Sequence, residues 1–156
     1  MYREFMKRAI DSATSGIKKL EGGPFGACIV LKGKVIAVAH NTVLQEKNPI
    51  CHAEINAITK AVKKLKSPFL EDCVIYSTTE PCPMCFSAIH WAKIKKVIYG
   101  TRISDVKRRG FNELQLPARK IKILANSPVQ LKASFMRKEC LDLLITWDNL
   151  DNKQVY

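Results

Sequence analysis

The chain has 156 residues, the size of one ordinary domain that can bury a core without cross-links. Hydrophobic residues make up 47% and charged residues 26%, which excludes a disordered chain; no run of ~18 apolar residues predicts a membrane span, and an early acid at Glu4 argues against a signal peptide, so a cytoplasmic location is expected. The formal net charge of +12 is compatible with a solvated lysine-rich surface or with a nucleic-acid-binding face.

Helical and extended patterns alternate in the first half of the chain. Residues 2–20 repeat apolar side chains at helical spacing and predict an amphipathic helix. Two apolar segments, 26–31 and 35–39, flank Lys32-Gly33-Lys34 and predict an antiparallel hairpin. A polar loop over 41–49 precedes a second helix that begins near Cys51 or His52. Its expected buried side chains are Ile55, Ile58, Val62 and Leu65.

The second half predicts strands at 73–77 and 96–100, separated by a helix from about Pro83 to Ala92. Beyond Thr101 the pattern becomes basic and irregular. An apolar run at 121–124 predicts the fifth strand, and the last helix is expected over about 135–147. Strand–helix–strand order implies parallel pairing, so the sequence predicts a single α/β domain over 1–156. It is a three-layer α/β/α sandwich with a mixed five-stranded sheet.

Two short segments carry side chains that can bind a metal or transfer protons, Cys51-His52-Ala53-Glu54 and Pro81-Cys82-Pro83-Met84-Cys85. His52, Cys82 and Cys85 offer three zinc ligands, which leaves a fourth position for water, as in catalytic zinc sites. Both segments lie at the start of a predicted helix, where the helix dipole lowers a thiol pKa. The order H-x-E followed by P-C-x-x-C is the signature of zinc deaminases.

Glu54 is the candidate catalytic residue. Zinc with two thiolates has no net charge, so a nearby base must help to activate the water. Glu54 can take the water proton, pass it to a ring nitrogen and later protonate the leaving ammonia. One alternative stays open at this point, because His40, His90 and Cys51 lie near the two segments and allow a closed structural site with four protein ligands.

With these residues in place, the chain resembles the cytidine and deoxycytidylate deaminase superfamily along its whole length, and most closely its bacterial guanine deaminases. The supporting residues are Gly22–Ala27, Asn41, His52–Glu54, Glu80–Cys85, Ala88-Ile89, Trp91-Ala92, Gly110-Phe111 and Tyr156. The resemblance implies a cytidine deaminase-like fold, one zinc ion per subunit, and an enzyme of purine metabolism that converts guanine to xanthine and ammonia.

The resemblance also implies roles for residues around the base. Phe25 packs on the base, Asn41 hydrogen-bonds a ring atom, and the backbone of Ala53 lies beside the attacking water. Trp91 helps to wall the pocket. An acid after Gly-Phe binds the ring and exocyclic N–H groups of guanine. Here that segment reads Asn112-Glu113 instead of two consecutive acids, and the assignment passes to Glu113.

The expected partners are a small-molecule nucleobase and a second copy of the chain. By resemblance, the C-terminal tail, about 148–156 and ending in Tyr156, covers the site of a neighbouring subunit in a domain-swapped homodimer. A membrane partner is not expected.

Other functions remain open from the sequence. A tRNA-specific adenosine deaminase, converting adenosine to inosine, shares the zinc site and explains the basic surface. Another nucleoside or cytosine deaminase also fits, as does a non-catalytic zinc scaffold that binds RNA. The Gly-Gly-Pro-Phe-Gly segment and the residues after Gly110 favour the free-base enzyme, and a tail ending in Tyr156 is suited to closing a pocket that a flipped nucleotide needs open.

Overall fold

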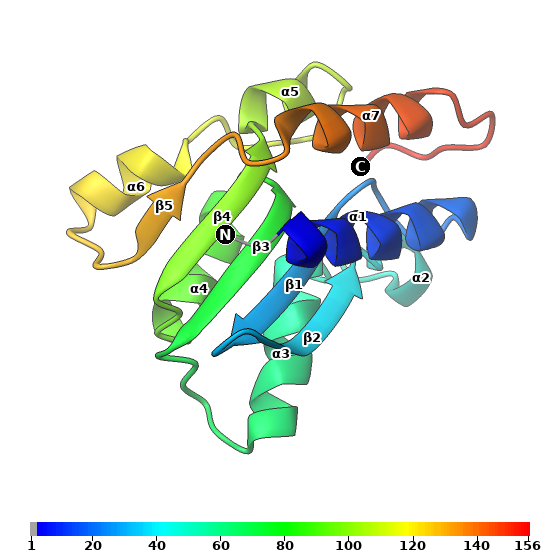
Figure 1. Cartoon of the computed structure of the whole chain (residues 1–156). Coiled ribbons are helices and arrows are strands. Elements are labelled where there is room, and N and C mark those ends of the chain that lie inside the picture. Colours follow the sequence, from blue (N-terminus) through cyan, green and yellow to red (C-terminus); the bar gives the residue numbers. More distant parts are fainter. Residues whose placement is uncertain (1–2) are drawn as a thin grey trace.

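A five-stranded sheet forms the centre of the molecule, and the computed structural model describes residues 3–156 (Figure 1). The strand order is β2-β1-β3-β4-β5. The elements are α1 (Arg3–Lys18), β1 (Gly26–Leu31), β2 (Lys34–His40), α2 (Val43–Glu46), α3 (Ala53–Leu65), β3 (Cys73–Thr79), α4 (Pro83–Trp91), β4 (Lys96–Thr101), α5 (Ile103–Lys107), α6 (Ala118–Leu124), β5 (Gln130–Lys132) and α7 (Arg137–Asp148).

The sheet is mixed, as the sequence predicts. β1 pairs antiparallel with β2 and with β3, whereas β3–β4 and β4–β5 are parallel. The hairpin between β1 and β2 turns at Lys32 and Gly33, which have φ angles of 48° and 77°. Glycine adopts such a left-handed angle without steric cost, and two consecutive positive φ angles match the right-handed twist of the flanking strands.

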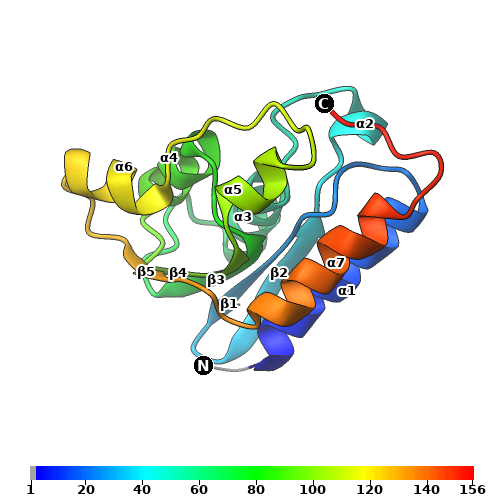
Figure 2. The ribbon, with the colours of Figure 1, turned by 90° about the horizontal axis from the view of Figure 1, so that it is seen from above.

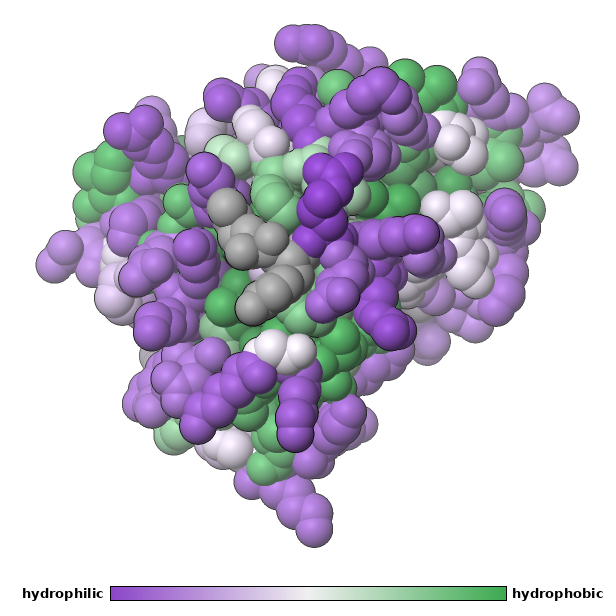
Figure 3. Space-filling view, in the orientation of Figure 1, coloured by the Kyte–Doolittle hydropathy of each residue, from purple (hydrophilic) through white to green (hydrophobic). Residues whose placement is uncertain are grey.

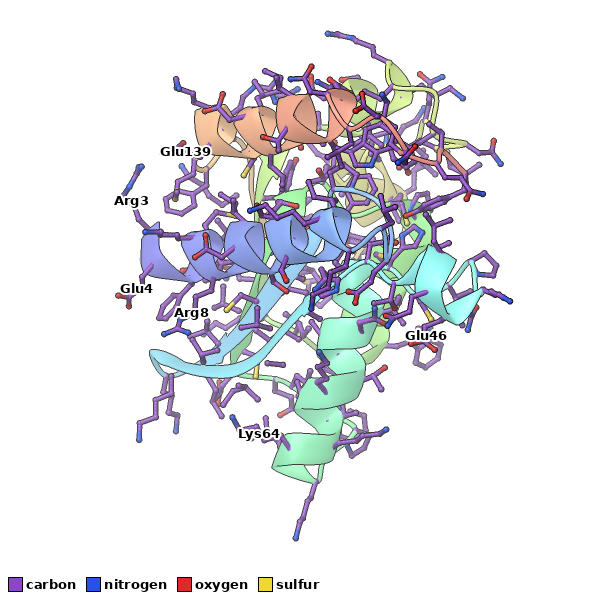
Figure 4. All side chains as sticks on the ribbon, turned by 90° about the vertical axis from the view of Figure 1, so that its right-hand side faces the viewer. Arg3, Glu4, Arg8, Glu46, Lys64 and Glu139 are labelled. Atoms are coloured by element: carbon purple, nitrogen blue, oxygen red, sulfur yellow. The ribbon has the colours of Figure 1, made fainter. Side chains whose placement is uncertain are left out.

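Helices cover both faces of the sheet, which makes the three predicted layers (Figure 2). On one face α1 and α7 pack together over β1, β3 and β4, with Phe5, Met6 and Cys140 in their shared core. Arg3 of α1 pairs there with Glu139 of α7 (Figure 4). On the other face, α3, α4 and α6 supply side chains to the larger core. The predicted fold class is confirmed.

The fifth strand lies elsewhere than the sequence predicts. Residues 121–124 belong to α6, and β5 is the three-residue segment Gln130–Lys132. Ala118 is buried and Ile121 packs against the core three residues later, on one helical face. Ile123 is 66% exposed, so the period-two Ile-Lys-Ile pattern does not mark a strand with one buried face.

Smaller differences concern helix boundaries and buried faces. α1 ends at Lys18, which leaves Leu20 outside the helix and 46% exposed. The fully buried face of α3 consists of alanines at four-residue spacing, and Ile58, Val62 and Leu65 are partly buried beside it. Two short helices, α2 and α5, occupy stretches that the sequence indicates as loop or irregular. Ala53, Ala57 and Ala61 let α3 lie close to the sheet.

Hydrophilic side chains cover most of the face seen in Figure 3, with smaller apolar areas between them. No helix within residues 3–156 combines the length and the apolar character needed to cross a bilayer. The two segments that carry the candidate catalytic and metal-binding residues lie together at one end of the sheet. β3 ends at Thr79, and the α4 segment with Cys82 follows directly, next to the start of α3.

Candidate active site

Three candidate metal ligands lie close together where α3 and α4 begin. His52 is the N-cap residue of α3, Cys82 is the N-cap residue of α4, and Cys85 lies in the first turn of α4. The Nδ1 atom of His52 is 3.7 Å from the Sγ atom of Cys82 and 3.5 Å from that of Cys85. Ligand distances of about 2.3 Å for sulfur and 2.0–2.1 Å for nitrogen place tetrahedral N and S ligands about 3.6 Å apart. The trio therefore fits zinc.

The charge state of the trio also suits a metal. The hydrogen bond with Cys85 and, to a smaller extent, the one with His52 lower the pKa of the Cys82 thiol to about 4 despite its burial. The same shared proton, together with burial, raises the pKa of Cys85. One thiolate is thus present at neutral pH, and a metal ion would displace the second proton, because thiolates are the zinc-binding form.

The three other candidate ligands do not join this group. His40 hydrogen-bonds Ser12 and Glu21, and His90 hydrogen-bonds Ser127. Cys51, although it precedes His52, is not part of the cluster. Within residues 3–156, the trio is the one set of His, Cys, Asp and Glu side chains close enough to share a metal. Three protein ligands leave a position for water, as in catalytic zinc sites.

Glu54 lies beside the trio as the second residue of α3, and it is 6% exposed. Its Oε1 atom accepts a hydrogen bond of 3.0 Å from the hydroxyl of Ser77, a buried residue of β3. Burial raises the pKa of Glu54 above that of an ordinary glutamate. A carboxyl group with a raised pKa exchanges protons more readily near neutral pH, and the Ser77 hydroxyl holds it in one orientation.

A cavity of about 330 Å³ opens over these groups. His52, Glu54 and Cys82 line it, and Phe25, Glu113 and Tyr156 line it as well. Six of the predicted catalytic, metal and substrate residues, spread along the sequence from Phe25 to Tyr156, therefore line this one cavity. Its size is within the range of small-molecule sites. Thr79, Glu80 and Phe111 also line the cavity, although none of the three is predicted from the sequence as a site residue; Glu80 and Phe111 belong to the motifs that carry the resemblance.

Asn41 is buried at 1% exposure directly behind this wall. Its Oδ1 atom accepts hydrogen bonds from the Tyr156 hydroxyl at 2.6 Å and from the backbone N–H of Val43 at 3.1 Å, and both of these residues line the cavity. A Cβ atom on Gly22 would lie 2.2 Å from Oδ1, so only glycine leaves room for the amide. Within the described residues, Nδ2 of Asn41 has no hydrogen-bond partner.

An unpaired buried donor costs about 1–3 kcal/mol unless a ligand satisfies it. The unpartnered Nδ2 atom of Asn41 is therefore a candidate substrate contact. In the cavity wall, burial raises the pKa of Glu113 to about 7. The site thus combines a buried donor with a carboxyl group that changes its charge near neutral pH.

The C-terminal tail closes the cavity of its own chain. The backbone N–H of Asn112 donates to the carbonyl of Tyr156 at 3.0 Å. The Tyr156 ring packs edge-on against Phe111, with centroids 5.4 Å apart, and Phe111 packs against Phe25 at 5.2 Å. Burial raises the pKa of Tyr156, which keeps its hydroxyl protonated. Exchange of residues 148–156 between subunits of a homodimer stays a prediction.

Two predicted substrate residues lie differently from the others. Ala53 is the first residue of α3 and fully buried between His52 and Glu54, and the role of its backbone stays a prediction. Trp91 is 79% exposed and lines a separate surface depression with Phe69 and Pro128. The expectation that Trp91 walls the pocket is wrong for the pocket of this chain, because the last turn of α4 points it outward.

Comparisons of sequence and of structure identify known proteins that are similar to this chain. The family model for the cytidine and deoxycytidylate deaminase zinc-binding region matches residues 1–101. Guanine deaminase from Bacillus subtilis (strain 168) is 44% identical over 112 residues, which are 72% of each chain. The tRNA-specific adenosine deaminase from Aquifex aeolicus (strain VF5) is 43% identical over 117 residues, 72% of this chain and 76% of the relative. A solved structure of guanine deaminase from Nitrosomonas europaea superposes with a TM-score of 0.84 at 25% identity, covering 94% of this chain and 84% of the other.

Proposed function

This chain belongs to the cytidine and deoxycytidylate deaminase family and is a hydrolase that acts on a cyclic amidine, and we propose that its substrate is guanine, which it converts to xanthine and ammonia. The observation that carries the proposal is the Glu113 carboxyl group in the wall of the cavity that His52, Glu54 and Cys82 also line. A second group, the unpartnered Nδ2 atom of Asn41, lies directly behind that wall. Guanine matches both groups at once.

Guanine carries two adjacent donors on one edge, the ring N1–H and the 2-amino group. A carboxylate has two acceptor oxygens and can take both bonds. The ring also carries acceptor atoms, including O6 and N7, for an amide N–H such as that of Asn41. Adenine offers an acceptor nitrogen next to its amino group, so the same carboxylate would face a lone pair. This contrast favours guanine over adenine.

The reaction exchanges the 2-amino group for an oxygen from water. A zinc ion held by His52, Cys82 and Cys85 would lower the pKa of a water molecule and so supply a nucleophile at neutral pH. Glu54, anchored at Oε1 by Ser77, takes the water proton at its other oxygen and delivers it to the ring nitrogen beside the attacked carbon. It then takes the proton of the hydroxyl group that the attack leaves on the ring carbon and gives it to the departing amine, so that one guanine and one water give one xanthine and one ammonia.

The proposal extends to composition and assembly. We propose one zinc ion per chain, since residues 3–156 provide one ligand trio. We also propose a homodimer and a role in purine metabolism, as the motif resemblance implies.

Deamination of adenosine in tRNA is the second candidate. It is favoured by exposed basic side chains before and after the Phe111–Leu114 wall, among them Arg102 and Arg108, which cap α5, and Arg119 of α6. Such side chains neutralise phosphates. Against this candidate, Tyr156 occupies the cavity wall, where a flipped nucleotide would need an open path for its backbone.

Ammonia release from a panel of substrates tests the proposal. Zinc-loaded protein is incubated with guanine, guanosine, cytosine, adenine and a tRNA anticodon stem, with the Glu54→Gln variant as the matched inactive control. We expect ammonia from guanine alone, and none from the variant. Turnover of the tRNA stem without turnover of guanine would refute the proposal. An absence of turnover with every substrate would favour a non-catalytic zinc scaffold.

A further inference from the structure

One part of the cavity wall is a segment without helix or strand. Residues 108–117 connect α5 to α6 (Figure 2). They supply Phe111, Asn112, Glu113 and Leu114 to the cavity. The backbone hydrogen bonds found within 110–116 are local, apart from the one between Asn112 and Tyr156. No ladder of sheet hydrogen bonds therefore sets the distance between Glu113 and the zinc ligands.

Glu80 joins the starts of the two helices that flank this segment, α5 and α6, to the zinc-binding segment. It lies one residue after β3 and two residues before Cys82, and it is 7% exposed. Its Oε2 atom accepts the backbone N–H of Ile103 at 3.2 Å, and its Oε1 atom accepts the backbone N–H of Ala118 at 2.9 Å. Ile103 is the first residue of α5, and Ala118 is the first residue of α6.

The backbone of Glu80 is itself fixed. Its N–H donates to the carbonyl of Thr101 at 2.9 Å, which links it to the end of β4. Both carboxyl oxygens are engaged by backbone donors, so the side chain is held on both sides although it borders the cavity. An acid–base role in the reaction would need a carboxyl oxygen that faces the substrate, and the backbone donors already engage both oxygens of Glu80.

From these contacts we propose that Glu80 is a positioning residue that sets the place of Glu113 relative to the zinc ligands. The proposal rests on the guanine-binding role of Glu113 in the proposed function. Only an acidic side chain suits the geometry, because a carboxyl group offers an acceptor on each oxygen, whereas an amide offers one acceptor and one N–H₂ group. In Glu80→Gln, that N–H₂ group would face a backbone N–H, and one of the two anchors would be lost.

A double-mutant cycle separates positioning from general stabilisation. The variants are Glu80→Gln, Glu113→Gln and the double variant, assayed for kcat and KM with guanine. Loss of one hydrogen bond to a charged group corresponds to a fall in kcat/KM of about 10- to 100-fold, and we expect most of it as a rise in KM. If Glu80 acts through Glu113, its substitution in the Glu113→Gln background changes kcat/KM by no more than about threefold. Equal falls in both backgrounds would overturn the proposal.

Asp105→Asn is the matched control. Asp105 is 5% exposed and accepts the backbone N–H of Arg102 beside α5, but its other partner is Arg137 of α7 rather than the start of α6. We expect this variant to lose stability with little change in the KM for guanine. A rise in KM equal to that of Glu80→Gln would mean that any loosening of α5 suffices, and would overturn the proposal.

Amide hydrogen exchange tests the same idea without substrate. Exchange across residues 110–116 should quicken at least tenfold in Glu80→Gln, with zinc content unchanged, and should not quicken in Asp105→Asn. Unchanged exchange in Glu80→Gln would overturn the positioning role, whether or not guanine is the substrate. Glu80→Asp, whose shorter side chain reaches one anchor but not both, serves in place of Glu80→Gln if that variant does not fold, with the same expected pattern.

If the wild type does not turn over guanine, the proposed function fails while the exchange experiment still decides the role of Glu80. If guanine is turned over and the cycle shows additive effects, the proposed function stands and the positioning role fails.

Discussion

Replacing Ser77 with alanine tests the assignment of Glu54 as the proton carrier. The substitution removes the 3.0 Å hydrogen bond to Oε1 of Glu54 and changes almost no volume, and both side chains are buried. A hydrogen bond to a charged group is worth about 1.5–3 kcal/mol. Because Ser77 donates to the carboxylate form, its loss raises the pKa of Glu54 further above the ordinary value.

The measurement is the pH dependence of kcat/KM with guanine. A change of 1.36 kcal/mol corresponds to one pH unit, so the acidic limb should move upward by about 1 to 2 pH units. At a pH on that limb, kcat/KM should fall about 10- to 100-fold. Ser87→Ala is the matched control, because Ser87 donates to a backbone carbonyl of α4 at the exposed surface, and its profile should not move.

An unchanged acidic limb in Ser77→Ala would refute the reasoning. It would show that Glu54 does not control the limb, or that its orientation does not depend on Ser77.

The remaining predictions concern Glu113, Asp105 and the tail. Burial raises the pKa of Glu113 to about 7, and guanine binding needs the carboxylate form. The KM for guanine should therefore rise as the pH falls below about 7. A KM that is unchanged from pH 8 to pH 6 would count against this binding role of Glu113. The pKa of Asp105 is depressed, first by its hydrogen bond with Arg137, so its contribution to stability is present above its unfolded pKa of about 3.9 and is lost as the pH falls through the lower folded value. Asp105→Asn should therefore cost about 1.5–3 kcal/mol at pH 7 in urea unfolding, and the difference from wild type should shrink below about pH 4; an equal difference at pH 3 would contradict this. Deleting Tyr156 removes its bonds to Asn41 and Gly23, and should raise KM for guanine roughly 10- to 100-fold with zinc content unchanged; an unchanged KM would show that the tail does not shape the site.

Much of the candidate site could be predicted from local sequence. His52 and Cys82 are N-cap residues, and the two-residue spacer brings Cys85 into the first turn of the same helix, so helix geometry alone places Cys82 and Cys85 together. The early hairpin and the middle strands were equally readable, because their apolar runs are bounded by glycine and proline. Such signals lie within a few residues of each other.

Contacts that depend on the tertiary fold could not be predicted in this way. The Ser77–Glu54 bond spans 23 residues, and the Glu80–Ala118 bond spans 38. Neither a serine within a strand nor a glutamate before a proline has a local sequence pattern that indicates a distant partner. The sequence of α6 predicts a strand because the four residues Ile-Lys-Ile-Leu fit both the helical and the strand period, and only the burial of Ala118 and Ile121 decides between them.

The direct test of the central claim is guanine turnover by three zinc-loaded proteins measured side by side, the wild type, Glu54→Gln and Glu113→Gln. We predict xanthine and ammonia in equal amounts from the wild type, no turnover by Glu54→Gln, and kcat/KM reduced at least tenfold in Glu113→Gln, the loss of about one charged hydrogen bond. Guanine turnover by Glu113→Gln at the wild-type rate, with Glu54→Gln inactive, would contradict the account of how this deaminase recognises its base.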